Sequence, residues 1–402
     1  MAGTPDTVYM NSTARNVGLL AVCQALLLTN NSTLIAINGL AGRSLAPIPA
    51  LATLPVTGWV AGGALATMLA SLHMKRVGRK RGLEMGTLWG IAGALLCGGA
   101  VWAQSFWLLC FGALVFGVYN AYGQYYRFAA ADVAGASFKS TAISLVLAGG
   151  LVGGILGPTT SRFTINLMQP KFVAAYLALI AFAVATMAVL HFVRIPPLDD
   201  KAKAASGRPL RTIAAQPKFI VAVLSGAIGY GVMNFLMTST PIAMDVCGHP
   251  YGDAAFVISS HVIAMFAPSF VTGRVIRRFG VLPVMFTGAL LNFAAIGIAL
   301  SGVAVTQFWW SLVCLGVGWN FLYIGGTTLL TETYRPEEMA KAQGANDQII
   351  FLMMVVSSFT SGMTVTTAGW AQVNLVALPL VAVVAVAIAW FGLSRHSRRV
   401  AA

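Results

Sequence analysis

Charged residues are scarce in this chain, and apolar residues are correspondingly abundant. Only 9% of the 402 residues are Asp, Glu, Lys or Arg, whereas 58% are hydrophobic. A soluble domain carries about 25% charged residues. Because so few side chains here are compatible with a water-facing surface, we expect the outer surface to face lipid, and an ordinary soluble protein is excluded.

Motifs for catalysis and for nucleotide binding are also missing. The sequence contains no catalytic triad, phosphate-binding loop or ATP motif, so we expect neither an enzyme nor an ATP-driven pump. Its five cysteines form no CxxC pair and no zinc-like spacing, and no prosthetic group is predicted. Cys23, Cys97, Cys110 and Cys314 lie in apolar segments, as small buried hydrophobes do.

Long apolar segments dominate what is present. A membrane helix needs about 20 mainly apolar residues. Twelve stretches meet this requirement, and they predict twelve transmembrane helices. The stretches are 17–40, 52–73, 83–103, 106–126, 142–164, 172–193, 218–241, 255–275, 282–303, 307–330, 346–368 and 372–393.

The basic residues are distributed unevenly over the loops between these segments. With the N-terminus inside, the inside segments hold 22 of the 25 Lys and Arg, and only Arg43, Arg162 and Lys171 lie outside. This bias is the positive-inside rule, which places both termini in the cytoplasm. No cleavable signal is evident. The net charge of +14 therefore reflects membrane topology, with the lipid bilayer rather than nucleic acid as partner.

The chain reads as two halves joined by a linker. Residues 195–217, the longest polar stretch, predict a cytoplasmic linker between six-helix bundles at 1–194 and 218–402. The halves repeat: Arg76-Val-Gly78 corresponds to Arg278-Phe-Gly280 at an offset of 202. Internal repeats of this kind are typical of secondary transporters, whose substrate site lies between the halves.

The Lys75-Arg-Val-Gly-Arg-Lys80 loop resembles the signature between helices 2 and 3 of the major facilitator superfamily. This resemblance covers the whole chain and implies an all-α membrane protein with twelve transmembrane helices in two six-helix bundles. The family usually has an aspartate just before the first Arg of the loop, where this chain has Met74-Lys75. Other charges are therefore candidates for the inside gate, and these are Arg127, Asp132, Glu332 and Lys341. Ordinary interfacial charges are the competing interpretation of the same four residues.

A glycine-rich run at Gly149–Pro158 (GGLVGGILGP) loosely resembles the motif of drug antiporters. Small residues also permit close contact between helices. We favour close packing over an antiporter function, because no Asp or Glu lies clearly in mid-membrane and Asp347 comes closest.

Two neighbouring segments each carry a pair of soft metal ligands, Met233 with Met237 and His261 with Met265. Residues four apart lie on one face of a helix. Three thioethers and an imidazole suit Cu(I) and suit hard cations poorly. Methionine is also a common filler of apolar cores, which is the competing interpretation. Cys247 and Met244 add soft ligands at the outside mouth.

The paired MxxxM and HxxxM pattern is similar to that of CcoA-like transporters, the copper-importing branch of the superfamily. The resemblance implies that Met233, Met237, His261 and Met265 bind copper as the transported substrate. It also implies that copper crosses the bacterial inner membrane for assembly of cbb3-type cytochrome oxidase. A cytoplasmic copper chaperone or a copper-exporting ATPase would then receive the ion.

An organic solute is the alternative, with riboflavin first, since a closely related branch of the superfamily imports it. Aromatic rings with amides can sandwich a flat heterocycle. Two helices carry such side chains: Tyr119, Asn120, Tyr122, Gln124, Tyr125 and Tyr126 on one, and Trp319, Asn320 and Tyr323 on the other.

Overall fold

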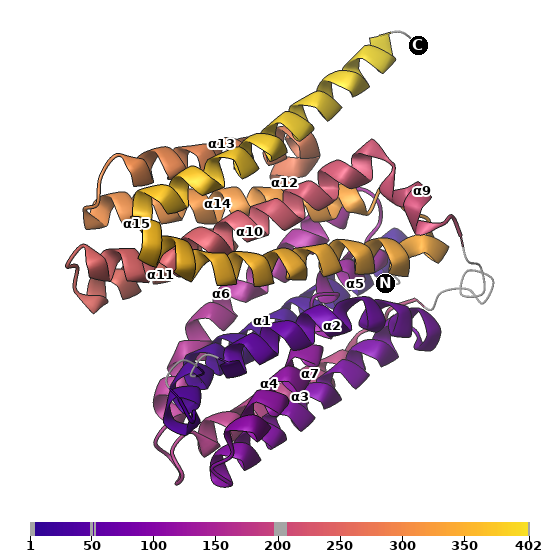
Figure 1. Ribbon diagram of the computed structural model, residues 1–402. Helices are drawn as coiled ribbons and strands as arrows, with labels where there is room; N and C mark the ends of the chain where they lie inside the picture. The colour runs from indigo at the N-terminus through magenta and orange to yellow at the C-terminus, as the bar shows by residue number, and fades with distance from the viewer. Residues whose placement is uncertain (1–4, 49–50, 52–53, 197–206, 401–402) are drawn as a thin grey trace. The chain divides into compact units, whose positions relative to one another are not determined.

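A computed structural model describes residues 5–48, 51, 54–196 and 207–400 (Figure 1). Every regular element within these ranges is a helix, as the apolar segments predict. The chain divides into two compact units, Met1–Ala205 and Ser206–Ala402.

The boundary between the units falls inside the predicted linker, of which residues 197–206 lie outside the described residues. The rest of this segment is more ordered than a polar linker should be. It forms the short helix α9 (Leu210–Ala214), and Ile213 is fully buried. The domain bounds stay a prediction, and the structure adds that Ile213 anchors the last part of the linker to the second unit.

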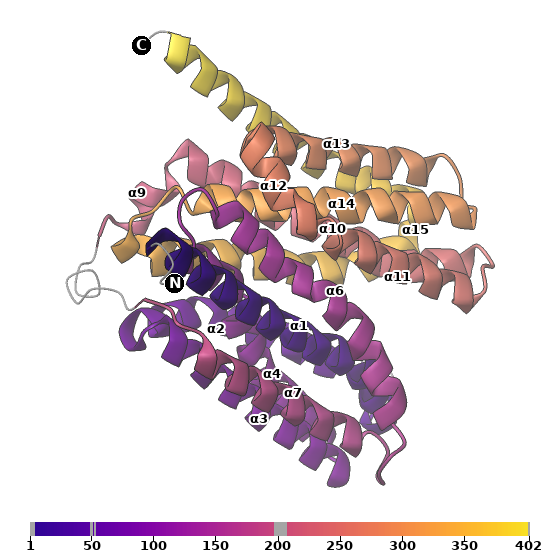
Figure 2. The same ribbon diagram turned by 180° about the vertical axis from the view of Figure 1, so that it is seen from behind.

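In the first unit, α1 packs against α6 and α7, while α4 packs against α2 and α3 (Figure 2). Pro158 lies inside α6, and α5 follows α4 after a break of two residues. The helices are α1 (Pro5–Leu45), α2 (Leu54–Val77), α3 (Arg79–Trp102), α4 (Phe106–Gly123), α5 (Tyr126–Val133), α6 (Lys139–Thr164) and α7 (Val173–Phe192).

In the second unit, α14 packs against α10, α11 and α13, and α10 also packs along α15. The helices are α10 (Pro217–Val246), α11 (Tyr251–Phe266), α12 (Ser269–Phe279), α13 (Val281–Leu300), α14 (Val305–Leu330), the 3₁₀ turn η2 (Pro336–Glu338) and α15 (Met339–Val400).

The number of membrane spans agrees with the prediction when the bent pair α11–α12 is counted as one span and the broken helix α15 as two. Among the described residues, ten helices are long and apolar enough to cross a membrane, and α11 with α12 can form one further span bent by 41°. The 62-residue α15 holds two legs on either side of Gly369, whose φ of 78° breaks the helix. Together these give the twelve expected spans.

The internal repeat is visible in the backbone. Gly78 precedes α3 with φ 92° and ψ 149°, and Gly280 precedes α13 with φ 91° and ψ 160°. Only glycine adopts this region readily. The two copies of the Arg-x-Gly motif therefore make the same turn in the two units.

The glycine-rich run of α6 is a packing seam. A Cβ atom at Gly149, Gly153 or Gly157, which are spaced four residues apart, would collide with α1. Thr33 on α1 donates a hydrogen bond of 3.0 Å to the Gly157 carbonyl across this seam. Close helix packing explains the run, as favoured from the sequence.

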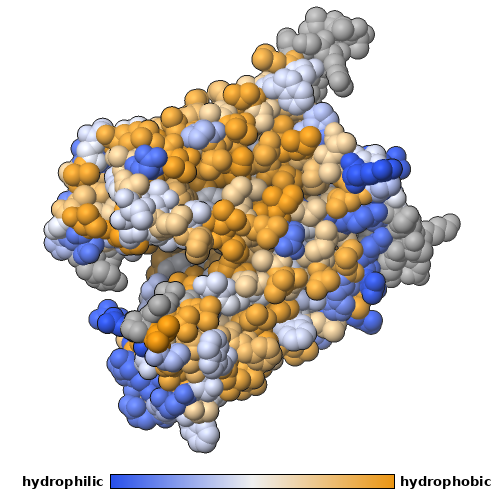
Figure 3. Space-filling view, in the orientation of Figure 1, coloured by the Kyte–Doolittle hydropathy of each residue, from blue (hydrophilic) through white to orange (hydrophobic). Residues whose placement is uncertain are grey.

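The outer surface of each unit is apolar. Figure 3 shows that hydrophobic residues cover the middle of the viewed face, while hydrophilic residues gather near the helix ends. Leu65, Trp107 and Phe359 are among the large apolar side chains that are mostly exposed. Lipid tails would remove these surfaces from water.

Candidate functional site

His261 on α11 is the best-defined part of the predicted ligand set. Its side chain is completely buried, and Nδ1 lies 2.7 Å from the Leu312 carbonyl oxygen on α14. Because a carbonyl can only accept, Nδ1 donates this bond. In the neutral ring Nε2 then carries the lone pair. Within the described part of the chain, Nε2 has no hydrogen-bond partner.

Met265 lies one turn further along α11 and is also buried. The two helices approach closely here, because a Cβ at Gly316 of α14 would lie 3.0 Å from the Met265 nitrogen. Asn320 fixes the contact by donating a 2.6 Å hydrogen bond to the Met265 carbonyl. His261 and Met265 therefore share one face of α11 that is held against α14.

The predicted partners Met233 and Met237 lie on α10, which also packs against α14. Met233 is buried and Met237 is half-buried. Since α10 and α11 also contact each other, the two pairs lie on neighbouring helices as the sequence predicts. Thioether and imidazole groups suit a soft ion, and the joint binding of one ion by these two pairs stays a prediction.

The two predicted ligands at the outside mouth differ in accessibility. Cys247 is exposed at the C-terminal cap of α10. Met244 is fully buried one turn earlier, and its function as an entry ligand stays a prediction. Its position in the helix turns its side chain toward the interior of the unit.

An aromatic cluster lies on the same three helices. Trp319 and Tyr323 of α14 stack with ring centroids 5.0 Å apart and an interplanar angle of 16°. Tyr230 of α10 meets both rings edge-on, and Phe266 of α11 meets Trp319 at 5.7 Å. Trp319 and Tyr323 are buried, whereas Tyr230 and Phe266 are half-exposed. The buried Trp319–Tyr323 pair therefore packs against two rings, Tyr230 and Phe266, that are partly exposed.

Asn320, predicted to bind solute beside this cluster, has a structural function instead. Its amide nitrogen donates to the Met265 carbonyl and to Ser269 Oγ, and its oxygen accepts from Thr272 at 2.7 Å. These bonds hold the bent α11–α12 pair against α14. Its donors are therefore used within the protein.

The aromatic residues predicted on α4 and α5 are mostly core. Tyr119, Tyr125 and Tyr126 are almost completely buried. Tyr125 donates its hydroxyl proton to the Thr67 carbonyl at 2.9 Å, and Tyr122 lies 2.7 Å from His73 Nδ1. Their contacts are with neighbouring helices of the first unit, as in ordinary packing.

The amides of the first unit form a connected group. Asn31 of α1 donates to Asn120 Oδ1 at 2.7 Å, and Gln124 donates to the same oxygen at 3.3 Å. Asn120 is thus occupied by its own unit rather than directed outward. Packing of α1 against α4 explains these contacts.

The charges predicted for the inside gate have partners within their own units. Asp132 accepts 2.8 and 3.1 Å bonds from Arg79 of the signature loop, rather than from Arg127. Arg127 is buried, donates to the Gln124 carbonyl at 3.0 Å and lies over the Phe128 ring. Arg79 is a residue that the sequence did not identify for this role.

In the second unit, Glu332 pairs with Lys218 at 2.8 Å, and Lys341 donates to the Arg208 carbonyl at 2.9 Å. Whether the four predicted residues act as a gate stays a prediction. Asp132, Glu332 and Lys341 each bind a residue on a distant segment of the same unit, whereas Arg127 binds the nearby Gln124 carbonyl.

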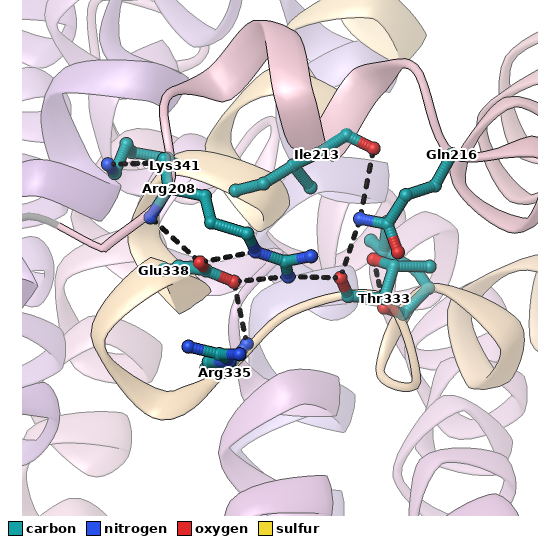
Figure 4. A network of polar contacts seen from close by, with 8 residues as sticks. Arg208, Ile213, Gln216, Thr333, Arg335, Glu338 and Lys341 are labelled. Carbon is teal, nitrogen blue, oxygen red and sulfur yellow. Dashed lines mark hydrogen bonds and ion pairs between the residues drawn. The ribbon is translucent and has the colours of Figure 1, made fainter.

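A further ion pair, absent from the sequence prediction, closes the end of the second unit (Figure 4). Arg208 donates to Glu338 from Nε at 2.7 Å and from Nη2 at 2.6 Å. The backbone nitrogens of Arg208 and Arg335 donate to the same carboxylate at 2.8 and 3.0 Å. Glu338 is completely buried, whereas the Arg208 side chain is 33% exposed. The Glu338 carboxylate raises the pKa of Arg208 above its ordinary value.

Asp347 is the described acidic residue that lies furthest from a helix end. It follows the start of α15 by about two turns, is 2% exposed, and accepts a 2.7 Å hydrogen bond from Asn346. Ionisable groups at such a depth are costly and mark pathways by default. The sequence singled out this residue, and the structure adds its burial.

Comparisons with known proteins agree with this architecture. The sequence profile of the Major Facilitator Superfamily matches residues 20–358. The riboflavin transporter RfnT of Brucella anthropi is 40% identical over 376 residues, which are 92% of this chain and 94% of that protein. YddS of Bacillus subtilis, an uncharacterized MFS-type transporter, is 28% identical over 85% of this chain and 82% of its own length. The outward-conformation crystal structure of the transporter FucP has a TM-score of 0.75 at 16% identity, covering 94% and 99% of the two chains.

Proposed function

Because this chain belongs to the major facilitator superfamily of secondary transporters, we propose that it imports riboflavin or a closely similar flat heterocyclic solute. The observation that carries this proposal is the 40% identity to a riboflavin transporter along nearly the full length of both chains. This relative supports the riboflavin alternative more directly than the copper interpretation of the sequence.

The aromatic cluster of the second unit supplies a surface of suitable chemistry. Tyr230 and Phe266 are half-exposed rings on the buried Trp319–Tyr323 stack. Aromatic pairs contribute about 0.5–1.5 kcal/mol beyond their area burial. In the proposed complex, the isoalloxazine ring of riboflavin stacks against Tyr230 or Phe266, and the buried pair holds that ring in place.

Labelled riboflavin uptake in a riboflavin auxotroph tests this assignment. Replacing Tyr230→Leu or Phe266→Leu should raise KM by about twofold to tenfold, since one stacking contact is lost. Phe256→Leu is the matched control, because Phe256 is an exposed ring on the same helix that stacks on Trp309 instead. An equal effect of all three substitutions would contradict the assignment of the cluster.

Copper is the second candidate substrate, and a specific observation favours it. His261 donates from Nδ1 to a backbone carbonyl, which leaves Nε2 buried with an unused lone pair one turn from Met265. Metal-binding histidines commonly have such a second bond, which fixes the ring and its tautomer. Under this proposal Met233, Met237, His261 and Met265 bind Cu(I) during import, and a cytoplasmic chaperone or copper-exporting ATPase receives it.

Cellular copper measured by mass spectrometry separates the two candidates. Met265→Leu removes the thioether with little change in volume, and Met285→Leu on α13 is the control at another buried methionine. Copper import predicts that Met265→Leu abolishes copper accumulation while Met285→Leu retains it. Riboflavin import predicts that the chain leaves copper accumulation unchanged and that both variants still take up riboflavin.

A further inference from the structure

A basic hollow lies at one end of the first unit and shares no residue with the aromatic cluster or the Met/His set, which belong to the second unit. It has a volume of about 470 Å³ and is lined by the start of α1 and the end of α7, through Arg15, Leu19, His191, Phe192 and Arg194. The positive-inside pattern predicts that this end faces the cytoplasm.

The cations of the hollow are available to a ligand. Arg15 and Arg194 are exposed, and neither guanidinium has a hydrogen-bond or ion-pair partner among the described residues. Asn16 bonds the backbone of Arg194 at 2.9 and 3.0 Å, so it positions this residue without engaging its side chain. Lys80 donates to the His191 carbonyl at 2.6 Å, which brings a third cation to the rim.

The apolar part of the hollow lies beside the lipid-facing surface. Phe192 is 65% exposed and is the last residue of the α7 span, while Leu19 is half-buried on α1. Since the α1 span begins at Thr13, Arg15 lies within the first turn of that span. Two guanidinium groups thus line the hollow beside an exposed aromatic ring, at the end of the spans where we expect lipid headgroups to meet acyl chains.

We propose that this hollow binds the phosphodiester headgroup of an anionic phospholipid. The planar guanidinium group binds phosphate oxygens in a bidentate manner. Basic pockets between transmembrane helices on the cytoplasmic side bind anionic headgroups by this chemistry. Arg15 and Arg194 hold the phosphate, and the acyl chains lie along Phe192 and Leu19.

Native mass spectrometry of the full chain in detergent, titrated with cardiolipin and with phosphatidylcholine, tests the proposal. The chain should bind cardiolipin in preference to phosphatidylcholine. Each arginine near an anionic surface should contribute about fivefold in affinity, so Arg15→Gln with Arg194→Gln should lose about twenty-fivefold. Both residues are exposed, so thermal unfolding of the double variant should match that of the parent chain.

Arg81→Gln is the matched control, because Arg81 is an exposed arginine at the start of α3, predicted to face the same side of the membrane, and does not line the hollow. This variant should bind cardiolipin as the parent does. Equal losses in Arg81→Gln and the double variant, or no loss in the double variant, would overturn the site. Displacement of cardiolipin by millimolar inorganic phosphate would overturn the lipid assignment and identify a free-phosphate site.

Discussion

The buried carboxylate of Glu338 offers a sharp test of how the second unit is held together. Glu338→Gln keeps the size of the side chain but removes its charge and turns one acceptor oxygen into a donor. In the parent chain the two carboxylate oxygens accept four hydrogen bonds. Oε1 accepts from the backbone nitrogen and Nε of Arg208, and Oε2 accepts from Nη2 of Arg208 and the backbone nitrogen of Arg335. At least one of these donors must therefore lose its partner.

The expected cost follows from burial and exposure. Hydrogen bonds to charged groups contribute about 1.5–3 kcal/mol each, and breaking a fully buried pair costs about 3–5 kcal/mol. Because the Arg208 side chain is 33% exposed, water solvates part of its charge when the partner is lost. We expect a net loss of about 2 kcal/mol, at the lower end of these ranges.

Thermal unfolding of purified protein in detergent measures this loss. For a unit of this size, 1 kcal/mol corresponds to about 2–4 °C in Tm, so Glu338→Gln should lower Tm by about 4–8 °C. Glu337→Gln is the control, since this neighbouring carboxylate is half-exposed outside the hydrogen-bonded cluster. Equal Tm values for the two variants would refute the argument that Glu338 anchors residues 207–217 to the second unit.

Other substitutions test the packing and the turns. Gly153→Val should destabilise the α1–α6 seam by about 1–3 kcal/mol, because a Cβ there would lie 2.7 Å from a backbone nitrogen of α1. Gly99→Ala is the control and should not lower Tm, because Gly99 has open space around it. Gly280→Ala should cost about 1–2 kcal/mol, read as a lower Tm, because its positive φ strains any L-residue. Arg79→Gln should destabilise the first unit, and a double-mutant cycle with Asp132→Asn should give a coupling of about 0.5–3 kcal/mol; additive effects would contradict the pairing.

The number and order of the spans could be predicted from the sequence because hydropathy over about 20 residues is a local property. The repeat was also predictable because the Arg-x-Gly motif is a local sequence pattern, and Gly78 and Gly280 do make equivalent turns. The break between α11 and α12 was not predicted, although Pro268 lies within it, because hydropathy averaged over the segment 255–275 stays mainly apolar on both sides of the proline.

The partners of the charged residues could not be predicted, because helix packing decides them. Asp132 is 53 residues from Arg79 and only five from Arg127, yet the distant arginine binds it. Glu338 and Arg208 are separated by 130 residues and meet only after α10 and α14 pack together. Spacing did predict that His261 and Met265 share a face of one helix, but not that Leu312 would fix the histidine ring.

The initial rate of labelled riboflavin uptake tests the proposed function most directly. It is measured in riboflavin-auxotrophic cells with and without the chain, at matched levels of protein in the membrane. The proposal predicts uptake well above that of the cells lacking the chain, and an equal rate for Met265→Leu. Uptake no higher than in cells lacking the chain would contradict it, and copper accumulation that requires Met265 would then identify the second candidate as the substrate.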